Sequence, residues 1–186
     1  MTGRATERKA APKAARNGSR VPVIVRAFSS RLGEAGPLAA ILLLAGVLAA
    51  CLLVAAELTT YRSIEVVTAS CEELSRSAGS EVADDCVTTG GEQHGWALLP
   101  IAAVVALMAW GAGPGRSRPA GAALVVLGVV VLGIGLVGDL PHVDVTGAVG
   151  RNFDQATGHA GPALWLTFAG GALAVAAGGA RLLARR

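Results

Sequence analysis

Four long apolar segments constrain the fold of this 186-residue chain more than any other feature of its sequence. Each has about 18 to 21 residues, and none carries an ionisable side chain before its last position. An α-helix needs roughly 20 apolar residues to cross a hydrocarbon layer about 30 Å thick. The helices of a soluble bundle would each keep a polar stripe, and these segments have none. We therefore expect four membrane spans, at residues 37–57, 96–113, 119–138 and 161–180.

The basic residues are distributed unevenly among the segments that flank these spans. The tail 1–36, the link 114–118 and the end 181–186 together hold 13 of the 16 Lys and Arg residues. The loops 58–95 and 139–160 hold ten acidic residues and only three arginines. Lys and Arg are retained on the cytoplasmic side of a membrane. The charge pattern therefore predicts that both termini are cytoplasmic and that both acidic loops are outside.

The N-terminal tail has a composition that differs from the rest of the chain. Its first 20 residues are rich in Ala, Arg, Lys, Gly and Pro, and they have no apolar face. Such a segment cannot bury enough surface to fold, so we expect 1–36 to be a disordered, basic cytoplasmic tail. Basic side chains suit the headgroups of anionic lipids. Because the first 20 residues contain no aromatic side chain, we expect contact with lipid and no nucleic-acid binding.

Small residues recur at helical spacing in the third and fourth predicted spans. Glycines repeat every seven residues in the third span, and small residues follow steps of three or four in the fourth. Such faces let helix backbones approach closely in a bilayer, where packing holds helices together. We expect them to pack inside one bundle, and homodimerisation is the alternative. The predicted packing positions are Gly121, Gly128, Gly135, Gly170, Ala174 and Gly178.

The first outer loop contains two β-branched segments and two cysteines. Segments 64–68 and 86–89 can pair as the short strands of a β-hairpin. Cys71 and Cys86 lie on the predicted oxidising face, so we expect a disulfide between them. Free thiols and pairing between chains are the alternatives. The expected fold class is an all-α membrane protein, a four-transmembrane-helix bundle with a small disulfide-linked outer loop.

All three histidines lie in the predicted outer loops. Imidazole and carboxylate groups are usual zinc ligands, which makes His94, His142, Asp139 and Asp144 the candidates for a metal site. No HxH or HExxH spacing is present, so we predict no metal and no cofactor. His94 and Asp139 flank predicted spans at the outer mouth, and they are the best candidates for any other site there.

Aromatic residues and one cysteine have simpler interpretations. Tyr61 follows the first predicted span and Trp165 begins the fourth, as in the aromatic belts of membrane interfaces. Cys51 lies within the first span, where it is expected to act as a small apolar residue. Patterns for signal cleavage at 54–56 and for lipidation at Cys51 are alternatives that the length of the apolar run disfavours.

Three stretches mark the ends of the second and third predicted spans: Gly91-Glu-Gln-His-Gly-Trp-Ala, Ser117-Arg-Pro-Ala and Gly138-Asp-Leu-Pro-His-Val-Asp-Val-Thr-Gly. Taken together, they resemble uncharacterised four-span membrane proteins of GC-rich bacteria, over roughly residues 38–183. The preference for Arg over Lys suits such a genome. The resemblance implies a bacterial cell membrane and no known activity. The layout is also similar to claudin-like four-span proteins, although the tryptophan-rich signature of their first loop is missing here.

Few polar groups in the spans point to transport or catalysis. Ion or proton transport usually leaves an ionisable residue inside a span, whereas the span interiors offer only Cys51 and Thr167. No Ser-His-Asp or Cys-His spacing predicts an enzyme. We expect a structural or accessory protein that binds a partner through its acidic outer loops, and not an enzyme. The alternatives are a small transporter or channel for an uncharged solute and a membrane-embedded enzyme with a site at the outer mouth.

Overall fold

The structure is a computed structural model that describes residues 36–66, 73, 76, 86–152 and 155–184. The predicted disordered tail, except for its last residue, therefore lies outside the described residues. So do Cys71 and most of the first outer loop around it. The description that follows concerns the helical bundle and the parts of both outer loops that connect to it.

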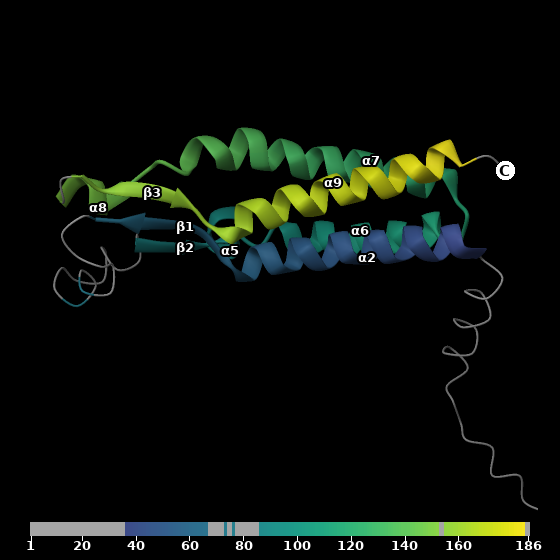
Figure 1. Ribbon diagram of the computed structural model, residues 1–186, viewed down its shortest axis with the longest axis horizontal. Coiled ribbons are helices and arrows are strands. Elements are labelled where there is room, and N and C mark those ends of the chain that lie inside the picture. Colours follow the sequence, from purple (N-terminus) through teal and green to yellow (C-terminus); the bar gives the residue numbers. More distant parts are fainter. Residues whose placement is uncertain (1–35, 67–72, 74–75, 77–85, 153–154, 185–186) are drawn as a thin grey trace, which may run out of the picture.

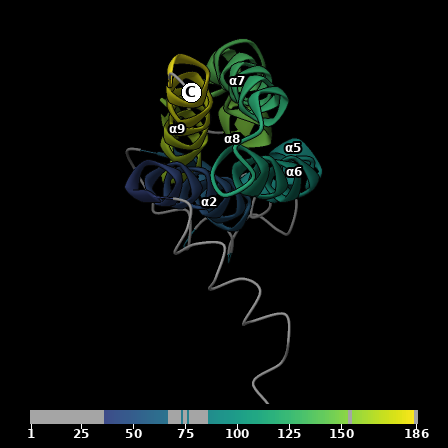
Figure 2. The same ribbon diagram turned by 90° about the vertical axis from the view of Figure 1, so that its right-hand side faces the viewer.

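Four helices lie along the long axis of the molecule and form a bundle (Figures 1 and 2). They are α2 (Gly36–Leu58), α6 (Leu98–Ala112), α7 (Arg118–Gly133) and α9 (Pro162–Leu183). Helix α9 packs against both α7 and α2, and α6 packs against α2 and α7. The first residue of α2 and the last residue of α9 lie at the same end of the bundle (Figure 1).

The helix starts follow from the local sequence. The side chain of Ser117 accepts a hydrogen bond from the backbone N–H of Ala120 and caps α7. Pro119 and Pro162 occupy the first turns of α7 and α9, where the first amides have no intrahelical partner. Helix α7 continues beyond Gly133 as a π-helical turn, η1 (Ile134–Asp139), and then as a 3-10 turn, η2 (Leu140–His142).

Among the residues that the structure describes, three helical segments are long and apolar enough to cross a membrane: Gly36–Leu58, Arg118–His142 and Pro162–Leu183. The expectation of a helical membrane protein is confirmed to the extent that these three helices have the length and composition of membrane spans. Helix α6 is also apolar, but it has only 15 residues.

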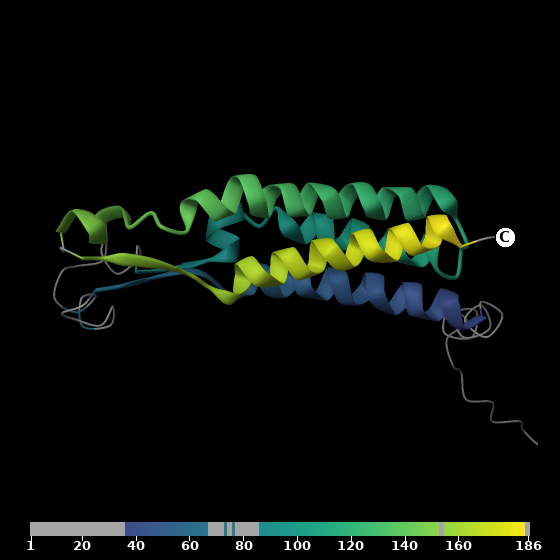
Figure 3. The ribbon, with the colours of Figure 1, turned by 45° about the horizontal axis from the view of Figure 1, so that its top comes forward.

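A three-stranded sheet projects beyond one end of the bundle (Figures 1 and 3). Strand β1 (Thr60–Glu65) follows α2, β2 (Val87–Thr89) precedes the short helix α5 (Gly90–His94), and β3 (Thr157–Ala160) leads into α9. β1 is the central strand and is antiparallel to both neighbours. The pairing of two segments of the first loop agrees with the sequence analysis, although β1 begins before the predicted segment 64–68 and ends within it. The third strand, from the second loop, was not predicted.

The buried apolar side chains fall into three clusters along the molecule. One lies between the four helices, one lies where the bundle meets the sheet, and one lies between the sheet and the short helix α8 (Gly147–Asn152). Their largest fully buried members are Leu53, Val105, Leu124 and Val131, then Tyr61, Leu98 and Leu164, and finally Ile64 and Val149. The middle cluster surrounds the polar residues that form the candidate site.

Candidate functional site

Glu57 is a fully buried carboxylate in the last turn of α2. Its Oε1 accepts a hydrogen bond of 2.7 Å from the backbone N–H of Leu98, the first residue of α6. The residue before α6, Ala97, offers no side-chain cap, so the carboxylate of one helix caps the next. A negative charge is favoured at a helix N-terminus, where the first N–H groups lack partners. This contact explains why an acid can stand at the end of an apolar helix and still be buried.

His94 is held in place by the short helix that it ends. Thr89 and Glu92 form a reciprocal capping box at the start of α5. Gly95 then closes α5 in the left-handed conformation, with φ of 59°, which favours glycine. A side chain at Gly90 would collide with the backbone of Ala56, so α5 can dock on the end of α2 only with glycine there.

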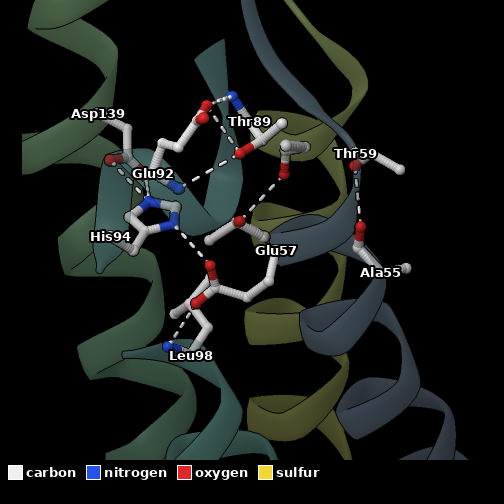
Figure 4. Close-up of polar contacts among 10 residues, drawn as sticks. Ala55, Glu57, Thr59, Thr89, Glu92, His94, Leu98 and Asp139 are labelled. Carbon is white, nitrogen blue, oxygen red and sulfur yellow. Dashed lines mark hydrogen bonds and ion pairs between the residues drawn. The ribbon is translucent and has the colours of Figure 1, made fainter. Parts of the chain in front are cut away.

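Asp139 lies at the end of the π-helical turn η1 and is 2% exposed. Both of its carboxylate oxygens lie 3.0 Å from Nε2 of His94 (Figure 4). Its backbone carbonyl accepts a hydrogen bond of 2.5 Å from the hydroxyl of Tyr61 in β1. Single π-helical turns within α-helices are frequent at functional sites. Asp139 therefore connects the end of α7 to β1 and to α5, which both belong to the first outer loop.

Glu57, His94 and Asp139 form one buried group, which we call the acid–histidine cluster. Nδ1 of His94 lies 3.9 Å from Oε2 of Glu57, and this oxygen has no hydrogen-bond partner among the described residues (Figure 4). The ring of Tyr61 packs edge-on against the imidazole, with centroids 6.0 Å apart. The imidazole is thus placed between two carboxylates that come from different helices.

The charges in the cluster favour a protonated histidine. The hydrogen bond to Asp139 raises the pKa of His94 above its usual value, although burial acts in the opposite direction. The charges of Asp139 and Glu57 and a backbone hydrogen bond with Gly90 raise this pKa further. Burial and the nearby Asp139 raise the pKa of Tyr61 to about 12, so its hydroxyl keeps its proton. Chemically, the cluster can hold one proton away from water and can join three chain segments.

The other metal candidates lie apart from this cluster. Nδ1 of His142 is 2.6 Å from the carbonyl oxygen of Gly138, and both His142 and Asp144 are exposed. Only His94 and Asp139, of the four candidates, contact each other directly. In the described part of the chain, no three His, Cys, Asp or Glu side chains are arranged to hold a metal ion.

The two predicted outer loops, 58–95 and 139–160, are joined to each other and to the bundle. The Arg62 guanidinium donates to the carbonyls of Val145 at 2.6 Å and His142 at 3.4 Å, and it also reaches the Thr88 hydroxyl. The N–H of Gly161 donates to the carbonyl of Tyr61 at 2.7 Å. We call the unit made of β1, β2, β3, α5 and α8 the outer platform. Its position is fixed by these bonds and by the acid–histidine cluster beneath it.

The predicted packing positions all lie at helix contacts. Gly121 and Gly178 face each other across α7 and α9, and Gly128 faces the backbone of Gly171. Gly135 lies against Phe168, Gly170 lies against Leu53, and Ala174 is buried. Thr167 is buried as well, and its hydroxyl donates to the carbonyl of Ala163 within the same helix.

Two of the three cysteines, Cys51 and Cys86, lie within the described residues. Cys51 is a free cysteine on the exposed surface of α2. Cys86 is buried in the cluster beneath the sheet with Ile64 and Val149. Because Cys71 lies outside the described residues, its pairing with Cys86 stays a prediction.

Glu57 and Tyr61 are the members of the site that sequence reasoning missed. Glu57 resembles the polar end of a span, and Tyr61 was assigned to an interfacial belt, yet both are fully buried. One available signal was that Glu57 is the only acid in an otherwise uncharged helix that is followed at once by a strand. The chain matches no protein-family model, no curated protein and no solved structure.

Proposed function

We propose that this protein is a multi-pass accessory membrane protein that binds a partner protein through its outer platform. The observation that carries the proposal is the way both outer loops are tied into one body. β1 pairs with a strand from each loop, and Arg62 and Tyr61 bond to the second loop. Loops that only connect helices do not need such a scaffold, whereas a binding surface gains from rigid support.

The proposal includes four spans with both termini in the cytoplasm of a bacterial cell. Helix α6 rises only about 22 Å at 1.5 Å per residue, which is less than an average hydrocarbon layer. It nevertheless packs between α2 and α7, so it must share whatever environment these two helices have. Local bilayer thinning can accommodate a short span. The link after α6 carries Arg116 and Arg118 at the end of the bundle opposite the platform, as the charge rule requires.

Reporter fusions test this topology. A reporter that is active only in the cytoplasm should work when inserted at Gly115 and should fail at Gly150, because these residues lie at opposite ends of the bundle. Activity at Gly150 would overturn the proposed orientation. Activity at both positions would overturn the four-span arrangement.

The partner is expected to carry a cationic surface. Ten acidic residues and three arginines lie in the two outer loops, and the side chain of Glu65 on β1 is 76% exposed. Opposite charges across an interface accelerate association and select the partner, with a strong dependence on salt. The basic cytoplasmic tail would hold the inner side of the protein on anionic lipid headgroups.

Photocrosslinking in intact cells tests partner binding. A crosslinking amino acid at Thr157 on the edge strand β3, which is exposed, should capture a discrete protein partner. The control position is Val126 on the surface of α7, which is 61% exposed but lies on the bundle. Capture at Thr157 and not at Val126 supports the platform as the binding surface. Capture of a protein at Val126 and not at Thr157 would place the interface on the bundle. No capture at either position would contradict the proposal.

A disulfide between Cys71 and Cys86 would complete the platform. In the chain-entropy model, closing a loop of about 15 residues stabilises the folded state by roughly 3 kcal/mol. After thiol blocking, mass spectrometry of non-reduced protein should find the two peptides joined. Labelling of both thiols in protein from an oxidising compartment would contradict the link, and a reducible dimer would show that it joins two chains.

A further inference from the structure

We propose that a proton on His94 locks the outer platform to the bundle, so that the platform loosens as the pH rises and His94 loses this proton. This inference concerns the regulation of the proposed partner-binding surface, and its biological use rests on that function. The physical lock itself depends only on the acid–histidine cluster.

The position of His94 allows one side chain to connect several elements. It ends α5, which continues directly from the edge strand β2. Its Nε2 reaches Asp139 at the end of η1, and its Nδ1 faces Glu57 at the end of α2 (Figure 4). The first loop, the end of α7 and the end of α2 therefore meet at one imidazole ring.

Loss of the proton would leave this arrangement without a neutralising charge. An imidazolium donates from both nitrogens, which matches the carboxylate on either side. A neutral imidazole that donates to Asp139 from Nε2 has a bare lone pair on Nδ1, which would face the Oε2 of Glu57 at 3.9 Å. Two buried carboxylates would then share the site without a cation, and neither this lone pair nor Oε2 would have a donor among the described residues. A buried unneutralised charge is strongly unfavourable.

No other group near the cluster, among the residues that the structure describes, provides a substitute charge. Tyr61, from β1, keeps its proton because its pKa is about 12. Arg62, also from β1, directs its guanidinium to backbone carbonyls of the second loop. Glu92, on the same short helix as His94, is an acid that accepts hydrogen bonds from Thr89. From α6, the cluster receives only the backbone N–H of Leu98.

The direction of the pH effect follows from linkage. The pKa of His94 is raised in the folded platform. A group with a raised folded-state pKa stabilises the folded state fully at pH values below its ordinary pKa of about 6.5. That contribution is lost as the pH rises through the raised pKa. The platform should therefore open more often as the pH rises above this range, while the apolar bundle, which lacks the histidine, should not respond.

Hydrogen exchange of the full-length protein in lipid nanodiscs provides the test. Exchange of residues 60–65 and 87–89 is followed by mass spectrometry and corrected for the chemical exchange rate at each pH. From about pH 6 to about pH 9, the opening equilibrium of these strands should rise at least about threefold, with α9 unchanged. His94→Gln keeps a polar side chain without a titrating proton, so its opening should not vary over this range. The matched control, His159→Gln, removes an exposed histidine beside Glu65 and should behave like the wild type.

A second variant keeps the test decisive if His94→Gln folds poorly. Asp139→Asn retains His94 and removes the charge that favours its proton, so the transition should move to lower pH. The lock would be overturned by an opening equilibrium that does not vary with pH in the wild type. It would also be overturned if His94→Gln varied with pH as the wild type does, or if the transition in Asp139→Asn did not move. Partner capture at Thr157 is measured separately at one pH. Failure of capture with an intact pH response would contradict the proposed function and leave the lock standing.

Discussion

The interior of the bundle and its outer end are held together by different physical means. In the interior, α7 and α9 approach so closely that a Cβ atom added to Gly178 would lie 2.5 Å from the carbonyl oxygen of Gly121. At the outer end, Glu57, His94 and Asp139 join helices through a hydrogen bond to backbone, an ion pair and shared burial. The interior depends on shape and dispersion, which no titration alters. The outer end depends on directional polar contacts, which are sensitive to protonation.

The largest effect is expected from a methyl group in the helix contact. Gly178→Ala places its Cβ against the backbone of Gly121, so α7 and α9 must separate. Overpacking of this kind costs about 1–3 kcal/mol, and a backbone obstacle puts this site near the upper value. The free energy of unfolding in mixed micelles should fall by about 3 kcal/mol and should do so equally at neutral and alkaline pH.

The neighbouring residue supplies a matched control. A Cβ atom at Gly179 would meet nothing within 4 Å. Gly179→Ala should therefore leave the bundle intact and stabilise it by about 0.5–1 kcal/mol through helix propensity. Equal losses for the two variants would mean that close approach at Gly178 does not hold α7 and α9 together.

The second effect concerns the cap that α2 provides for α6. Glu57→Ala removes the acceptor of the buried N–H of Leu98, and an unsatisfied buried donor costs about 1–3 kcal/mol. We expect a loss of about 2 kcal/mol, with greater exchange at the start of α6 than in its middle. Glu57→Gln keeps an acceptor oxygen, so it should restore most of this stability. If Gln is as damaging as Ala, the charge of Glu57 matters more than its hydrogen bond to α6.

The features that could be predicted from sequence are those encoded locally. An uninterrupted apolar run specifies a helix of membrane-spanning length, and prolines at 119 and 162 mark where two of the helices begin. The glycines spaced by seven residues define one face of α7, because that spacing is nearly two helical turns. Of the candidate site, His94 and Asp139 were identified because each is an ionisable residue beside a predicted span.

The remaining features depend on contacts between distant parts of the chain. Strand β3 has the sequence Thr-Gly-His-Ala, which has no strand pattern of its own, and it forms against the free edge of β1. Glu57 looks like any acid at the end of a span, and only the position of α6 shows that it faces a helix N-terminus. The hydrogen bond from Tyr61 crosses 78 residues to Asp139, and no local pattern encodes such a contact.

The smallest effect is expected at this long-range bond. Tyr61→Phe removes only the hydroxyl that donates to the carbonyl of Asp139, while the ring can keep its edge-on contact with His94. The net contribution of one such hydrogen bond is about 1 kcal/mol, so the loss should be near that value. Because the bond joins β1 to the end of η1, the loss should appear as faster hydrogen exchange in residues 60–65 and not in α9. Thr59→Val is the matched control, since the Thr59 hydroxyl donates to the carbonyl of Ala55 in the adjoining last turn of α2 and makes no bond to the described residues of the second loop. A decrease in the stability of the whole bundle with no local change in β1 would show that the outer platform and the bundle unfold together, and the contrast between the two regions would then be one of chemistry alone.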